Sequence, residues 1–184
     1  AVGNMKNFYQ PIKTNPDTDF NYELQRLITR NPADTMKYPW TDIGAGKLFA
    51  DFYQETLRYV PERRSWFCYA DGTWSTDTGG LKAMRYCMEL ANLLHLYALE
   101  IKDENQRKSY MDYSKRWQTH GYRVNVLKDA QVHHPISYVE FDKDPYIFNC
   151  NNGTLHLDSG KFTEHCSSDL LTKISAVAYD PLLN

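Results

Sequence analysis

The sequence lacks the cysteine spacing of a redox motif or a structural zinc motif. Its four cysteines, Cys68, Cys87, Cys150 and Cys166, form no CxxC pair and no dense framework. We therefore expect reduced thiols in a cytoplasmic protein. No apolar run approaches the length of a membrane span and the N-terminus has no signal-peptide core, so no membrane contact is expected. The formal net charge is −2, which excludes a histone-like basic protein and requires that any nucleic-acid contact come from a local patch.

A phosphate-binding loop is also missing. The stretch GAGK, Gly44–Lys47, is the nearest approach to one. Such a loop needs a glycine five positions before the Gly-Lys pair and a Ser or Thr after it. Thr41 and Leu48 occupy those positions, so neither the phosphate cradle nor the magnesium ligand is present. We predict no ATPase motor and no cofactor in this chain.

The histidines do not have the spacing of zinc ligands. Structural zinc sites bring their ligands in close pairs such as CxxC or HxxxH. The adjacent pairs His133-His134 and His165-Cys166 direct their side chains apart. We predict no metal site from them.

Asp142 and Asp144 form a DxD pattern that has two interpretations. In a strand this spacing places both carboxylates on one face, where they could hold a divalent metal. However, Asp144 precedes Pro145, and Asp-Pro favours the start of a turn. No second acidic cluster supports a two-metal site, so we favour the turn and predict no catalytic residue.

The sequence has the composition of an ordinary globular protein, and its middle part has the periodicity of helices. With 184 residues, 42% hydrophobic and 24% charged, it suits one domain, with or without a small appendage. Residues 1–40 are a polar lead-in or linker, partly ordered, with a short helix expected at 22–29. A helix capped by Thr41 or Asp42 follows and carries its apolar spacing as far as Leu57. Further helices are predicted over 78–101, over 104–120 with a stop at Gly121, and over 122–130.

Turn signals and short apolar arms indicate antiparallel strands at two places. Asp71-Gly72 lies between aromatic-rich arms, which is a strong hairpin signal. After Pro135 the arms are short, with turns at Asn152-Gly153 and at Asp158–Gly160. We expect a small meander there, with Leu155 and Leu157 inward and His156 and Asp158 outward. The predicted fold is α+β: one domain over 41–184, helical over 41–130 and β-rich over 136–184.

The stretch 105–128 combines basic and aromatic residues on a predicted helix. Tyr110, Tyr113 and Trp117 share one side at helical spacing, and we assign them to the core. The basic residues that we expect to contact phosphate are Lys108, Lys115, Arg116 and Arg123. The alternative is an ordinary solvated basic face.

Two long stretches together resemble a known family. The first, Thr41–Gly79, opens with a Thr-Asp-x-Gly element and continues through LRYV to two tryptophans around a turn. The second, Asp142–Pro181, matches the pattern DP, N-x-x-NGT-L-x-L and a Gly turn, followed by LTK and YDP. They are similar to the segment that precedes the helicase motor in phage- and plasmid-type primase-helicases, which include the poxvirus primase-helicase. Ala45-Gly46 and Ser159 are small departures from the family pattern.

The resemblance implies an accessory domain without catalysis of its own. In the family a superfamily 3 motor follows, a hexameric AAA+ ATPase that uses ATP and magnesium to pump DNA. The expected partners are therefore DNA, the downstream helicase domain of the same chain, and further copies of the full protein in a hexameric ring. The domain would form part of a collar on that ring and guide DNA, as a piece of a replication protein from a phage, plasmid or integrated element.

Two alternatives remain open. The chain could be a protein-interaction module that recruits replication partners without touching DNA. It could also be a metal-dependent nuclease or primase that uses Asp142 and Asp144, which we favour less.

Overall fold

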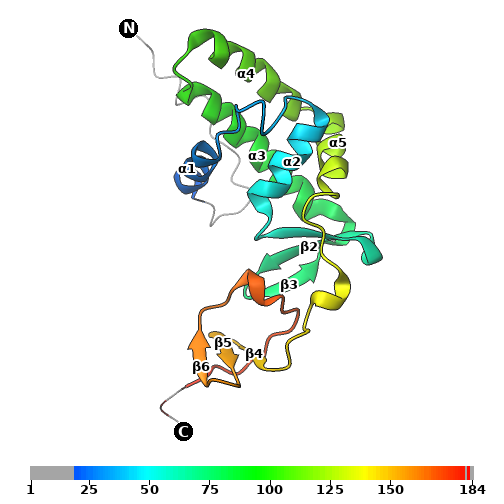
Figure 1. Cartoon of the computed structure of the whole chain (residues 1–184), viewed down its shortest axis with the longest axis vertical. Coiled ribbons are helices and arrows are strands. Elements are labelled where there is room, and N and C mark those ends of the chain that lie inside the picture. The colour runs from blue at the N-terminus through cyan, green and yellow to red at the C-terminus, as the bar shows by residue number, and fades with distance from the viewer. Residues whose placement is uncertain (1–18, 181, 183–184) are drawn as a thin grey trace. The chain divides into compact units, whose positions relative to one another are not determined.

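The computed structural model describes residues 19–180 and residue 182, so the expectation for the lead-in at 1–18 lies outside the described residues. The fold is α+β, with five α-helices and two three-stranded antiparallel sheets in the described residues (Figure 1). The chain forms two compact units from alternating segments. The helical unit contains the residues up to Phe52 together with Met84–Ala130, and the second unit contains the rest.

The helical unit starts with α1, Phe20–Arg30, the short helix predicted near the N-terminus. The Asp19 carboxylate caps it by accepting the amide hydrogens of Asn21 (2.9 Å) and Tyr22 (3.3 Å). Asn31 ends it in the left-handed conformation, with a φ of 51°. The other helices are α2 (Asp42–Tyr53), α3 (Leu81–Glu100), α4 (Glu104–Trp117) and α5 (His120–Ala130).

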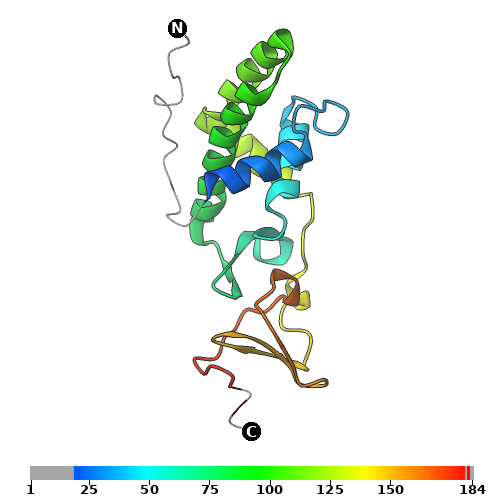
Figure 2. The ribbon, with the colours of Figure 1, turned by 90° about the vertical axis from the view of Figure 1, so that its left-hand side faces the viewer.

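Helices α3 and α4 run side by side (Figure 2). The Tyr97 and Tyr110 rings meet at 5.2 Å between centroids, and the Ser114 hydroxyl lies 3.4 Å from Nδ1 of His95. Tyr110, Tyr113 and Trp117 are all buried, as the helical spacing predicted. The aromatic side of α4 therefore belongs to the core of this unit.

Two predicted helix limits are wrong. Leu57 does not extend α2, because that helix ends at Tyr53 and Leu57 opens a strand. Gly121 does not stop α4, which ends at Trp117, and lies instead inside α5. The position of Leu57 fits both the helical and the strand periodicity. Its pairing with Cys68 on the neighbouring strand places it in a strand.

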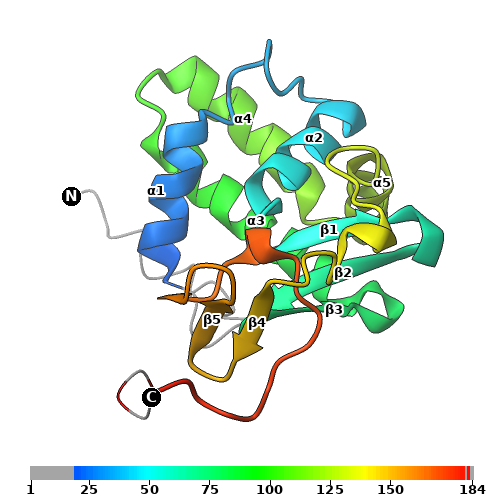
Figure 3. The same cartoon turned by 60° about the horizontal axis from the view of Figure 1, so that its bottom comes forward.

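The first sheet of the second unit has the order β1-β2-β3 (Figure 3). Its strands are β1 (Leu57–Val60), β2 (Ser65–Ala70) and β3 (Thr73–Thr76). The β2–β3 turn is Asp71-Gly72, with φ values of 49° and 78°, so the predicted hairpin is confirmed. The core on this sheet is buried and largely aromatic, formed by Val60, Phe67, Trp74, Ile136 and Phe141.

The second sheet has the order β4-β5-β6 and forms the predicted meander. Its strands are β4 (Ile147–Cys150), β5 (Gly153–His156) and β6 (Lys161–Thr163). The predicted faces are wrong: Thr154 is buried and Leu157 is 55% exposed. The hydrogen bonds of Asn149 require its face to turn inward, and the two-residue period of a strand then turns Leu155 and Leu157 to the other face.

None of the described helices is long and apolar enough to cross a membrane.

Candidate functional site

The predicted basic strip lies on α4 and at the start of α5, and two of its members are exposed lysines. Lys108 and Lys115 stand seven residues apart on α4, which places them on one side of the helix. The Lys115 ammonium lies 2.8 Å from Asp112, with 66% and 64% of the two side chains exposed. An ion pair this exposed is weak, so Lys115 stays available to a phosphate.

The two arginines of the strip already contact the protein. Arg116 donates to the Trp40 carbonyl at 3.1 Å and lies 4.6 Å above the Tyr122 ring. Arg123 is half-buried and donates to the Trp117 carbonyl at 2.9 Å, at the end of α4. A cation there satisfies one of the free helix carbonyls. The structure therefore separates two accessible lysines from two arginines that hold the fold, of which Arg116 keeps 48% of its side chain exposed.

The GAGK stretch lies inside α2 and serves packing. A Cβ on Gly44 would lie 2.0 Å from the Pro39 carbonyl oxygen, and one on Gly46 would lie 2.8 Å from the Ala130 nitrogen. Both glycines thus allow backbone to approach backbone. The Lys47 ammonium is held by Asp51 at 2.7 Å. No phosphate loop is formed here, as predicted.

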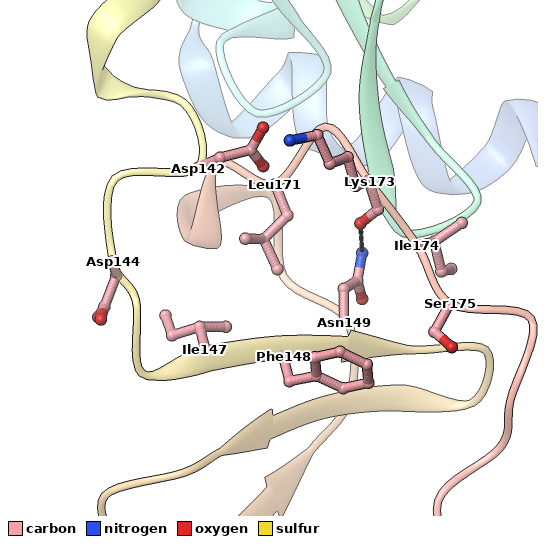
Figure 4. A pocket seen from close by; sticks show the side chains of 9 residues that line it. All are labelled: Asp142, Asp144, Ile147, Phe148, Asn149, Leu171, Lys173, Ile174 and Ser175. Carbon is pink, nitrogen blue, oxygen red and sulfur yellow. Dashed lines mark hydrogen bonds between the residues drawn. The ribbon is translucent and has the colours of Figure 1, made fainter.

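The DxD carboxylates organise loops. Asp142 has a φ of 52° and accepts hydrogen bonds from the Thr172 amide, at 2.8 Å, and from the Thr172 hydroxyl. Asp144 accepts the amide hydrogen of Tyr146 at 2.9 Å, which is an Asx turn. Their carboxyl groups point away from one another (Figure 4). The described residues contain no group of three or more His, Cys, Asp or Glu side chains placed to hold a metal.

Two asparagines of the second sequence stretch attach the C-terminal segment to the second sheet. The Asn149 amide donates to the carbonyls of Gly72 and Lys173, each at 2.9 Å. Asn152 both donates to and accepts from the backbone of Tyr179, at 3.0 and 2.8 Å. The spacing N-x-x-N therefore fixes the course of residues 171–179, and Asp142 does the same at Thr172.

A groove of about 330 Å³ lies where these contacts meet (Figure 4). Its apolar lining comes from Ile147, Phe148, Leu171 and Ile174. Its polar side chains include Asp142 and Asn149, which already bind backbone groups of the protein. The groove thus brings together motif residues with structural roles, and it carries no nucleophile with an adjacent base.

Comparison with protein families gives a match that spans most of the chain. The family described as "D5 N terminal like" matches residues 46–183. The chain belongs to this family. The D5 N-terminal-like domain is the N-terminal region of phage and poxvirus primase-helicase proteins, so the resemblance identified from the sequence is confirmed. A search of curated proteins finds no match.

The structure explains why the D5 N-terminal-like pattern has the residues it has here. Within the matched residues, Asn149, Asn152 and Asp142 anchor the last segment. Sequence reasoning missed a second groove, in which Arg63 lies over Tyr138. These two residues are far apart in sequence, and the only local signal was the Arg63-Arg64 pair after Pro61.

Proposed function

We propose that this domain is a non-catalytic part of a primase-helicase replication protein that guides DNA towards the helicase motor. It would contribute to a collar on a hexameric ring, whose motor, in another part of the parent protein, uses ATP and magnesium. Family membership supports the setting in DNA replication. The observation that carries the DNA contact is the pair of exposed lysines, Lys108 and Lys115, on one side of α4.

The contact expected of this strip is electrostatic. Lysine ammonium groups bind phosphate as point charges and release counterions, so they add affinity without reading sequence. Arg116 can add a third charge from the end of α4, because its ion pair with Asp42, at 3.4 Å, is exposed and therefore weak, and 48% of its side chain is exposed. Arg123 supports the strip by holding the junction of α4 and α5 at the Trp117 carbonyl.

The test is the salt dependence of DNA binding by a Lys108→Ala, Lys115→Ala double variant. The slope of log K against log salt is negative. For single-stranded DNA, loss of two phosphate contacts should make it less steep by roughly 1.4. Fluorescence anisotropy with a labelled oligonucleotide measures the slope. The charge-matched control is Lys82→Ala, Lys161→Ala, which removes two exposed lysines from outside the strip. A double variant that keeps the original affinity and slope contradicts the proposal.

A second candidate function is protein contact through the outer face of the second sheet. Tyr146, Phe148 and Leu157 are 59%, 48% and 55% exposed. The register pairs Phe148 with Leu155, and Leu155 with Phe162, so these side chains share one face. The Leu157 amide donates to the Tyr146 carbonyl at 2.7 Å, which continues the pairing and adds these two residues to the face. Exposed apolar groups gathered in this way are typical of a protein contact.

We infer that the partner at this face is the helicase domain of the parent protein. The C-terminal segment reaches the face at Tyr179, whose ring lies 5.0 Å from that of Phe162. A Phe148→Ser, Leu157→Ser variant of the parent protein should lose ring assembly, measured by light scattering, and keep its affinity for DNA. Val139→Ser, at a residue 72% exposed and outside this face, is the control. Unchanged assembly of the double variant excludes this function for the face.

A further inference from the structure

A second groove of the second unit has the chemistry of a nucleotide site. It is an open groove of about 380 Å³, lined by Arg63, Phe67, Trp74, Ser75, Thr76, Tyr138 and Thr172. Phe67 and Trp74 are buried, while Ser75 and Thr76 are exposed hydroxyl residues of β3. The groove thus combines a floor of aromatic side chains with two exposed hydroxyl groups and the positive charge of Arg63.

Its central feature is a stack of an arginine on a tyrosine. The Arg63 guanidinium carbon lies 4.0 Å from the centre of the Tyr138 ring. Tyr138 is 39% exposed and is supported by Phe67 and Phe141, with ring centroids 6.1 and 6.2 Å away. Nucleobases stack on aromatic rings and on guanidinium planes, so an arginine already stacked on a ring offers a base a prepared surface.

Glu62 holds this surface in place without neutralising it. Its carboxylate accepts hydrogen bonds from the Ser137 hydroxyl and, at 3.4 Å, from the Tyr138 amide. The Ser137 bond lowers the pKa of Glu62, so the carboxylate stays ionised and bound to this loop. In the described part of the chain neither Arg63 nor Arg64 is in an ion pair with an acidic group. Two adjacent exposed arginines are therefore free to attract phosphate.

We propose that this groove binds one nucleotide of single-stranded DNA, with the base stacked on the Arg63 guanidinium, which Tyr138 supports from beneath, and the backbone phosphate on the adjacent Arg64. The DNA partner rests on the proposed function, whereas the site is separate from the lysine strip of α4. The volume falls within the range of small-ligand sites and suits a single base with its sugar. Duplex DNA has no free base face to offer, so the site selects single strands.

The test separates stacking from charge by using abasic DNA. The chain is titrated with a fluorescent oligo(dT) and with the same oligonucleotide carrying abasic residues, at several salt concentrations. For the unmodified chain, abasic residues should weaken binding at least about fivefold, since a stacked base contributes that much or more. Arg63→Lys keeps the charge but loses the plane, and should weaken oligo(dT) binding at least about fivefold and abolish the difference between the two oligonucleotides. The salt slope should not change.

Arg85→Lys is the matched control, because Arg85 is an exposed arginine of α3 outside this groove, so the substitution should leave the affinity and the abasic difference intact. Tyr138→Leu keeps an apolar side chain against Phe67 and should act like Arg63→Lys. If a melting curve shows that Tyr138→Leu is unfolded, Arg63→Lys decides, because Arg63 is exposed.

Three results overturn the proposal: an Arg63→Lys variant with full affinity, an abasic difference that survives that variant, or no binding of oligo(dT) at all. Failure of the lysine strip looks different. In that case the Lys108, Lys115 double variant keeps the original salt slope, while the abasic difference persists.

Discussion

Asp77 caps α3 from the end of the first sheet: its carboxylate accepts the amide hydrogens of Lys82, at 3.0 Å, and Ala83, at 2.8 Å. The side chain is only 2% exposed, so these hydrogen bonds face little competition from water. Asp77→Ala should lower the free energy of unfolding by about 1–2 kcal/mol, the usual cost of losing an N-terminal cap. Asp77→Asn keeps a side-chain oxygen as acceptor and should cost less. Urea denaturation measures both, and an Asn variant as unstable as the Ala variant would show that both carboxylate oxygens are needed as acceptors.

Two helical glycines should respond to alanine in opposite directions. A Cβ at Gly46 would lie 2.7 Å from the Asp129 Cβ and 2.8 Å from the Ala130 nitrogen, so α2 and α5 would have to separate. Gly46→Ala should therefore destabilise the protein by about 1–3 kcal/mol. Nothing lies within 4 Å of the corresponding position at Gly121, in α5. Gly121→Ala should stabilise it by about 0.4–1 kcal/mol, because alanine loses less backbone entropy on folding. Thermal melting of the pair gives both signs, and destabilisation by Gly121→Ala would contradict its place inside a helix.

Asn149 should contribute more to the free energy of unfolding than Asn152 does, although both contact the C-terminal segment. Asn149 is 6% exposed and satisfies two carbonyls, whereas Asn152 is exposed. Asn149→Leu leaves the Gly72 and Lys173 carbonyls without this donor and should cost about 1–3 kcal/mol, at about 0.5–1.5 kcal/mol for each lost hydrogen bond. Asn152→Ala should cost about 1 kcal/mol or less. Hydrogen exchange of residues 171–179 should rise in both variants, and unchanged exchange would mean that other contacts hold the segment.

Glu89 should make stability fall as pH rises. Burial raises the pKa of Glu89 to about 7, with the charge of Arg85 opposing the rise and that of Glu23 adding to it. The folded state thus binds a proton that the unfolded state releases at its ordinary pKa of 4.5. The stabilisation from this proton is complete below pH 4.5 and is lost as pH rises through about 7. Glu89→Gln should therefore melt above the unmodified protein at pH 8 and close to it at pH 4.5. Parallel melting temperatures across that range would count against this protonation.

The sequence predicts local structure well where its residues fit only one kind of secondary structure. The aromatic side of α4 and the Asp71-Gly72 turn follow from spacing and from backbone preference alone. Leu57 was misassigned because its spacing suits both a helix and a strand, and only pairing with Cys68 decides. The faces of the second sheet were reversed because an asparagine, not the leucines, determines which side is buried.

The site was harder to predict because its residues act through contacts distant in sequence. A strip of four cations is readable from spacing, but the carbonyl of Trp40 beneath Arg116 is not. Likewise, Arg63 and Tyr138 belong to segments that no local pattern connects. Family membership was predictable because its motifs, such as N-x-x-NGT, are contained in short stretches of the sequence.

The alternating segments of the two units have a consequence for synthesis of the protein. Val60, Phe67 and Trp74 leave the ribosome long before Ile136 and Phe141, which complete their core. Met84–Ala130, the second segment of the helical unit, is synthesised between these two groups of residues. The first sheet must therefore wait, with part of its apolar surface uncovered, while the helices of the other unit are made. In a replication protein built this way, the second unit is complete only after the C-terminal segment has been synthesised. A chain truncated before Ile136 would expose these aromatic side chains and tend to aggregate.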